Sequence, residues 1–129
     1  MTPSTTAPPP DDRRPLGARA EQDAADRLTA SGWTILERNW RHRRGELDIV
    51  ARDGDTLVFV EVRSRRGARF GSPEESVDAR KQARLVALAQ GYVAGAGWSG
   101  PWRIDVVAVN VDAEGAPLRW AHYRNAVGF

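Results

Sequence analysis

GELDIVARDGDTLVFVEVR, residues 45–63, is the stretch of sequence that decides the fold. Two runs rich in β-forming residues, 46–52 and 56–63, lie on either side of Asp53-Gly54. An Asp-Gly pair between two such runs is a strong short-range signal for a β-hairpin with a two-residue turn. The stretch therefore predicts an antiparallel hairpin that turns at Asp53-Gly54.

The turn sets the register of the hairpin, and the register decides which side chains share a face. With Asp53-Gly54 as the two turn residues, Leu47 lies opposite Val60 and Ile49 lies opposite Val58. We expect these four side chains to form an apolar face that packs on the core.

The opposite face of the hairpin carries three acidic residues. Glu46 lies opposite Glu61, and Asp48 is a diagonal neighbour of Glu61 with Cα atoms roughly 7–8 Å apart. Acids this close repel one another unless a cation or arginines neutralise them, and their oxygens suit Mg²⁺ or Mn²⁺ better than zinc. The alternative is a solvated face on which Arg63 or Arg65 pairs with the acids, and a three-residue turn would separate Asp48 from Glu61.

Outward from the hairpin, the spacing of apolar residues predicts the remaining elements. Gly32 is a suitable stop for the first helix, and Asp78 is a suitable N-cap for the second. The expected elements are helices over 17–31 and 79–94 and strands over 33–39, 46–52, 56–63, 102–111 and 117–123. The order α-β-β-β-α-β-β indicates an α/β fold in which helices flank a mixed β-sheet.

The whole chain of 129 residues is long enough for one compact domain. Residues 1–15 are rich in Pro and Thr and are predicted to form a disordered tail, so the domain is expected over 16–129. The absence of cysteine excludes disulfides and thiolate metal sites, and two histidines are too few for a multi-histidine zinc site. Without a membrane-length apolar run or a signal peptide, we expect a cytoplasmic protein with no membrane partner.

Glu21 lies on the small, apolar stripe of the first predicted helix, one turn from Gly17 and from Ala25. A carboxylate that faces inward needs a partner. It either caps a loop or pairs with an arginine, or it points over the sheet toward Asp48 and Glu61.

Arginine supplies nearly all of the positive charge, since Lys81 is the only lysine among nineteen cationic side chains and the net charge is +2. Two arginine clusters flank the acidic hairpin residues along the chain. They are Arg38, Arg41, Arg43 and Arg44 before it, and Arg63, Arg65, Arg66 and Arg69 after it. Trp40 and Phe70 lie among them, and guanidinium groups beside aromatic rings suit a phosphate backbone with stacked bases. An acidic centre with basic flanks is the layout of metal-dependent phosphodiester cleavage, and the alternative is a solvated basic loop.

Two residues near the C-terminus are expected to be structural. Asp105 lies within a predicted strand among valines, and we expect it to pair with Arg103 or Arg84 rather than to bind metal. His122 has no evident partner in the sequence.

Several short motifs occur together in one order and spacing. They are Gly17-x-x-x-Glu21, Arg38-Asn39, Gly45-Glu46-Leu47-Asp48-Ile49, Phe59-Val60-Glu61-Val62, Phe70-Gly71, Lys81, Arg103-x-Asp105-Val106-Val107 and Asn125-Ala126. From about Gly17 to the C-terminus this series resembles the UPF0102 (YraN-like) family. The resemblance implies a restriction-endonuclease-like fold related to PD-(D/E)XK nucleases and close to archaeal Holliday-junction resolvases, which act as homodimers. It also implies that Asp48 and Glu61 bind Mg²⁺ with the help of Glu21.

The chain departs from the family pattern at Arg63, where the family usually has lysine. The resemblance implies that this lysine positions or activates the attacking water, a role in which arginine supplies charge but does not accept a proton near neutral pH. Lys81 is the candidate replacement. We therefore expect a protein that binds nucleic acid, with DNA as the partner, and that acts as a Mg²⁺-dependent endonuclease on structured or branched DNA. The alternatives are a binding module without activity and an adaptor for an acidic protein.

Overall fold

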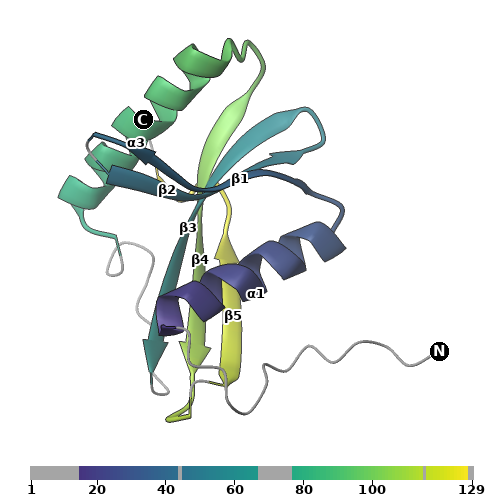
Figure 1. The fold of residues 1–129 in the computed structure, drawn as a ribbon, viewed down its shortest axis with the longest axis vertical. Coiled ribbons are helices and arrows are strands. Elements are labelled where there is room, and N and C mark those ends of the chain that lie inside the picture. The colour runs from purple at the N-terminus through teal and green to yellow at the C-terminus, as the bar shows by residue number, and fades with distance from the viewer. Residues whose placement is uncertain (1–14, 44, 67–76, 115, 128–129) are drawn as a thin grey trace.

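The computed structural model describes residues 15–43, 45–66, 77–114 and 116–127. Its elements are α1 (Leu16–Ala30), β1 (Thr34–His42), β2 (Gly45–Asp53), β3 (Thr56–Arg66), α3 (Ala79–Ala96), β4 (Trp102–Val111) and β5 (Pro117–Tyr123) (Figure 1). This order confirms the predicted α/β class. The tail predicted over 1–15, apart from Pro15, lies outside the described residues, as do Arg44 and Arg69. Within the described residues, no helix has the length and apolar character needed to cross a membrane.

The five strands form one mixed sheet in the order β1-β2-β3-β4-β5. Neighbouring strands are antiparallel except β3 and β4, which are parallel and are joined through α3. A parallel pair requires a crossover connection, and α3 provides it. Asp78 caps this helix as predicted, because its Oδ1 accepts a hydrogen bond of 2.8 Å from the backbone N–H of Lys81.

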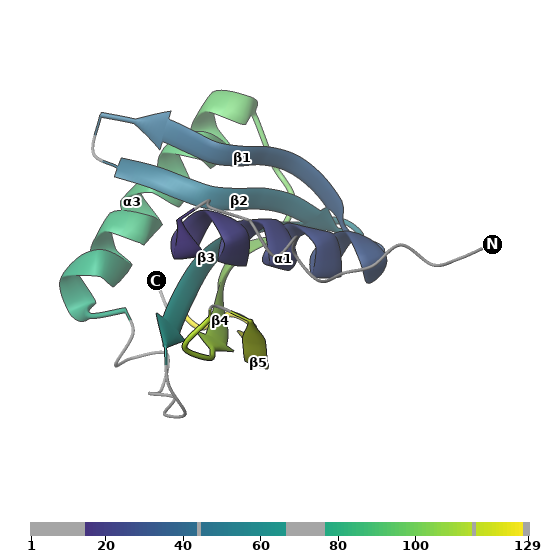
Figure 2. The ribbon, with the colours of Figure 1, turned by 60° about the horizontal axis from the view of Figure 1, so that its bottom comes forward.

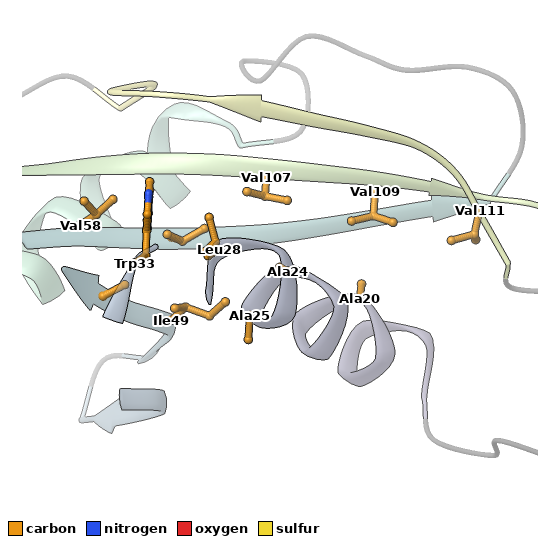
Figure 3. Close-up of a cluster of buried hydrophobic side chains, with 12 residues drawn as sticks. Ala20, Ala24, Ala25, Leu28, Trp33, Ile49, Val58, Val107, Val109 and Val111 are labelled. Atoms are coloured by element: carbon orange, nitrogen blue, oxygen red, sulfur yellow. The ribbon is translucent and has the colours of Figure 1, made fainter. Parts of the chain in front are cut away.

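Both faces of the sheet are buried, one under each helix. On the α1 face, Ala24 and Leu28 pack against Val58 and Val107 (Figure 3). On the other face, Leu85 and Leu88 of α3 pack in a second cluster with the alternate strand residues, Phe59 among them. This double burial explains why β3 and β4 are nearly continuous apolar runs.

The hairpin turn is displaced by one residue from its predicted position. Asp53 pairs with Thr56, so the turn residues are Gly54 and Asp55 rather than Asp53 and Gly54. Of the two, only Gly54 has a positive φ, 63°, which is the pattern of a type II′ turn with glycine first. The predicted register was therefore wrong, and Ile49 lies opposite Val60.

The alternation of faces in β1 and β2 breaks at Asn39 and Asp48. Ile49 packs on the α1 face, whereas Leu47 and its partner Trp40 belong to the α3 cluster. Asn39 has a φ of 53°, in the left-handed region that asparagine tolerates better than most residues. The prediction that Leu47 shares a face with Ile49 was wrong, because this irregularity changes the face of the residues beyond it.

Beyond the pair Ile49 and Val60, the regular pairing of β2 with β3 stops. Figures 1 and 2 show the two strands separating, with β1 and β2 leading away from β3 and β4. Asp48 in β2 is the neighbour of Ile49 on the unpaired side, and Glu61 in β3 is the neighbour of Val60 on the unpaired side. The separation of the strands therefore leaves both acids at one fork in the sheet.

Candidate metal and nucleic-acid site

Three carboxylates from two elements converge at this fork. Glu21 of α1 and Glu46 and Asp48 of β2 each place one oxygen within 4.8 Å of the others. Glu21 and Asp48 belong to the predicted metal set, whose third member was Glu61 rather than Glu46. We call Glu21, Glu46, Asp48 and Glu61 the acidic site. Glu46 joins it because it lies two residues from Asp48 along β2, on the side of the strand opposite Leu47.

Asp48 is the acid whose ionisation is most strongly opposed. Its Oδ2 accepts a hydrogen bond of 2.8 Å from the backbone N–H of Val62. Burial, and after it the negative charge of Glu61, raise the pKa of Asp48 to about 8 against the lowering effect of this hydrogen bond. The crowding of charge predicted between Asp48 and Glu61 is therefore present, and a bound cation would relieve it.

Glu21 projects from α1 into the same electrostatic environment. Burial raises the pKa of Glu21, the charges of Glu46 and Glu61 act in the same direction, and the Arg38 guanidinium opposes them. The Glu21 carboxylate thus points over the sheet toward the other acids. This is the second of the two alternatives given for Glu21 in the sequence analysis. Acids whose pKa values are raised by burial and by neighbouring negative charges cluster at functional sites.

Asn39 ties α1 to β2 across the acidic site. In the orientation that satisfies both of its side-chain atoms, the amide nitrogen donates to Glu21 Oε1 at 2.8 Å and to Glu46 Oε1 at 3.1 Å. We did not predict a role for Asn39 from the sequence. The available signal was an asparagine inside a predicted strand, where it is an unfavourable residue unless the backbone is irregular.

Glu61 is buried, with 4% of its surface exposed, and it contacts two cations. Its Oε2 lies 3.3 Å from Lys81 Nζ and 3.7 Å from Arg63 Nη1. Lys81 reaches Glu61 because Asp78 caps α3 one turn earlier and so fixes the start of the helix. Arg63, which stands in the place of the motif lysine, and Lys81, its candidate replacement, therefore lie against the same carboxylate.

Some of the predicted nucleic-acid-binding arginines contact other described residues of the protein, and others do not. Arg41 pairs with Glu46 at 3.2 Å, and Arg38 donates to Gln22 Oε1 at 2.8 Å. Arg66 donates to the backbone carbonyl of Ala113 at 2.7 Å, so its guanidinium group is bound at the turn between β4 and β5. Arg43 and Arg65 are exposed, and their side chains make no hydrogen bond or ion pair with another described residue.

A second polar cluster, distinct from the acidic site, surrounds Asp105. This carboxylate is fully buried; Arg103 Nε donates to it at 3.0 Å, the backbone N–H of Asn125 donates at 2.8 Å, and His122 Nε2 lies 2.8 Å away. Burial acts to raise the pKa of Asp105, but the hydrogen bonds from His122, Asn125 and Arg103 outweigh it and lower the pKa. The predicted pairing with Arg103 is confirmed, and His122 does have a partner.

Comparison with known proteins places the acidic site inside a family match. The model of "Uncharacterised protein family UPF0102" matches residues 20–109, a range that contains the acidic site and Lys81. A UPF0102 protein of Symbiobacterium thermophilum is 52% identical over 114 residues, covering 88% of this chain and 96% of that protein. A UPF0102 protein of Methylococcus capsulatus is 49% identical over 115 residues, covering 88% and 92%. One from Rhodococcus jostii is 46% identical over 113 residues, covering 86% and 94%.

Proposed function

The chain belongs to the UPF0102 family, and we propose that it binds nucleic acid and cleaves phosphodiesters of structured or branched DNA with Mg²⁺ or Mn²⁺. The observation that carries the proposal is the acidic site: carboxylates from α1 and β2 converge where β2 and β3 separate, within electrostatic reach of Glu61 in β3. Arginines from both flanking segments lie beside it. Acids that hold a cation beside groups that hold phosphate are the components needed to cleave a phosphodiester.

The donor set fits a hard divalent cation. All of the converging ligand atoms are carboxylate oxygens, which Mg²⁺ and Mn²⁺ prefer. Glu21, Glu46 and Asp48 would hold the ion, and Glu61 lies near enough to raise the pKa of Asp48. When bound, Mg²⁺ supplies positive charge that polarises a phosphodiester and favours the ionised form of water.

The residues around Glu61 have a separate role in the proposal. Lys81 and Arg63 place two positive charges at the same carboxylate, from α3 and β3 respectively. Lys81 would orient the attacking water and Arg63 would stabilise the charge that develops on the phosphate, because arginine stays protonated throughout. The exposed Arg43 and Arg65 would hold the phosphates of the bound strand.

Cleavage of labelled four-way junction, flap and duplex DNA in Mg²⁺, Mn²⁺ or EDTA tests this proposal. We expect metal-dependent products, and we expect Asp48→Ala to lower the rate at least a hundredfold, since even outer groups around a metal cost about 10- to 100-fold. Asp55→Ala is the matched control, because Asp55 is an exposed acid of the hairpin turn outside the acidic site. No product from the wild type, or equal product from Asp48→Ala, would refute the cleavage proposal.

A second candidate function is a nucleic-acid-binding module that does not cleave, and Arg63 in the place of the usual lysine favours it. Substitutions at Lys81 and at Arg63 distinguish the nuclease from the binding module. If Lys81 has taken over the role, Lys81→Met abolishes cleavage while DNA affinity stays within about threefold, and Arg63→Lys leaves the rate nearly unchanged. Cleavage that appears only in Arg63→Lys would identify the natural chain as the binding module.

The proposal includes a homodimer, as the resemblance to resolvases implies. The sheet leaves β1 and β5 as its edges, and edge strands carry unpaired backbone groups that another copy is able to pair with. Sedimentation equilibrium with and without junction DNA measures this state, and a monomer in both conditions would contradict it.

A further inference from the structure

A pocket of about 240 Å³ lies between β1 and α3, on the opposite face of β1 from the acidic site. Its lining residues are Trp40, His42, Arg43, Ala87, Leu88 and Gly91. Ligand pockets for drug-sized molecules span roughly 300–1,000 Å³, so this volume suits one heterocyclic ring system rather than a large cofactor. None of the lining residues belongs to the acidic site.

Aromatic rings form one wall of the pocket. The rings of Trp40 and His42 are stacked, with centroids 5.8 Å apart and planes 14° from parallel. Tyr92 meets the Trp40 ring edge-on at 5.3 Å, which holds the indole in place from the helix side. His42 is exposed, so the stack ends in a ring that a further planar group is able to cover.

Small residues of α3 create the space opposite this wall. A Cβ atom added at Gly91 would meet no heavy atom within 4 Å, and Ala87 lies one turn earlier on the same lining. Glycine in the middle of a helix costs roughly 0.5–1 kcal/mol relative to alanine, so Gly91 reduces helix stability while it keeps this side of the pocket open.

Charge distinguishes this pocket from its neighbour. The lining includes one cation, the exposed Arg43, and no acid. An adjoining pocket of about 280 Å³ shares Trp40 and Gly91 but is also lined by Glu37 and Tyr92. A phosphate is therefore attracted to the Arg43 end and repelled from the Glu37 end.

We propose that the pocket lined by Trp40, His42, Arg43 and Gly91 holds one unpaired nucleobase of the bound strand, stacked on the aromatic wall with its phosphate at Arg43. Aromatic platforms beside cationic side chains bind single strands in this way without regard to sequence. The inference rests on the proposed function and adds a substrate class, since it requires DNA with an unpaired segment. Trp40 is next to Arg41, which pairs with Glu46, so the segment would reach the acidic site around the edge strand β1.

Fluorescence anisotropy with a labelled single strand and a blunt duplex of the same length tests the inference. A length of about 12 nucleotides lies within the known site sizes of single-strand-binding proteins. We expect Gly91→Leu, which fills the pocket, and His42→Ala, which removes the outer ring, to weaken single-strand binding about 5- to 100-fold, as loss of a stacking ring does. Duplex affinity should change less than threefold. Ala94→Leu is the matched control, because it adds the same side chain to an exposed position of α3 that lines neither pocket.

The outcomes separate the pocket from the proposed function. If the wild type binds both DNAs but Gly91→Leu binds the single strand equally well, the base pocket is refuted and nucleic-acid binding stands. If Ala94→Leu weakens binding as much as Gly91→Leu, the pocket is also refuted, because bulk anywhere on α3 then has the same effect. If the wild type binds neither DNA at low salt, the proposed function fails and the pocket inference fails with it.

Discussion

Replacing Asp105 with alanine is expected to lower the free energy of unfolding by about 3–5 kcal/mol, the usual cost of removing one partner from a buried ion pair. The carboxylate is fully buried and accepts from Arg103 and the backbone of Asn125 while contacting His122. Its removal takes the acceptor away from the Arg103 Nε–H and the Asn125 N–H, while Arg103 keeps its contact with Asp53 through Nη2 at 3.2 Å. Guanidinium chloride unfolding at pH 7 measures the change, which corresponds to a fall in Tm of about 10–20 °C.

Two comparisons make the Asp105 prediction specific. Asp26→Ala, on the exposed side of α1, should change stability by less than about 0.5 kcal/mol, because surface ion pairs and hydrogen bonds contribute little. Since the pKa of Asp105 is lowered in the fold, its contribution is present above the ordinary pKa of 3.8 and is lost as the pH falls through the folded pKa. The difference between wild type and Asp105→Ala should therefore narrow in acid. A difference below 1 kcal/mol at pH 7 would contradict the prediction.

Replacing Asp48 with asparagine is expected to stabilise the metal-free protein at alkaline pH. The pKa of Asp48 is raised to about 8, so the folded state keeps a proton that the unfolded state has already released. The stability of the wild type therefore falls as the pH rises from about 4 to 8, whereas the asparagine variant has no such loss. Each pKa unit corresponds to about 1.4 kcal/mol, and partial solvent screening reduces the total to about 2–3 kcal/mol, or a Tm higher by about 5–10 °C at pH 9.

Thermal unfolding in EDTA at pH 5 and pH 9 measures this effect. Asparagine is the chosen substitution because its side-chain oxygen is able to accept the hydrogen bond from the Val62 N–H. Mg²⁺ should cancel this advantage at pH 9: at a hundred times its Kd, a ligand of the folded state adds about 2.7 kcal/mol to the wild type and nothing to Asp48→Asn, which offsets the advantage of about 2–3 kcal/mol. Asp55→Asn, in the exposed hairpin turn, should follow the wild type in all four conditions. An Asp48→Asn advantage that is equal at both pH values, or Mg²⁺ stabilisation that survives in this variant, would contradict the prediction.

Prediction from the sequence succeeded where the signal was local. The helices, the strands and their order were predicted within a few residues, because apolar spacing and end signals such as Asp78 depend only on neighbouring positions. The pairing of Asp105 with Arg103 was also predictable, since the two side chains lie two residues apart on the same side of one strand. Even the electrostatic coupling of Asp48 to Glu61 followed from the hairpin, although the register was shifted.

Prediction was incomplete where the backbone conformation of one residue changes the register of a hairpin or the face on which the following side chains lie. The turn begins at Gly54 rather than at Asp53, because a type II′ turn needs glycine first. Asn39 adopts a positive φ, and Leu47 therefore packs under α3 instead of beside Ile49. Neither event has a signal strong enough to be recognised from spacing alone.

By itself, the sequence determined the α/β order, an apolar hairpin face for the core and the acidic residues available for a site, because hydrophobic periodicity and side-chain chemistry are properties of single segments. Only the tertiary structure decided which of those groups meet: Glu46 with Glu21, Lys81 with Glu61, and His122 with Asp105. These contacts join residues from different elements. Their distances depend on how the strands separate and on where α1 and α3 pack, which no single segment specifies.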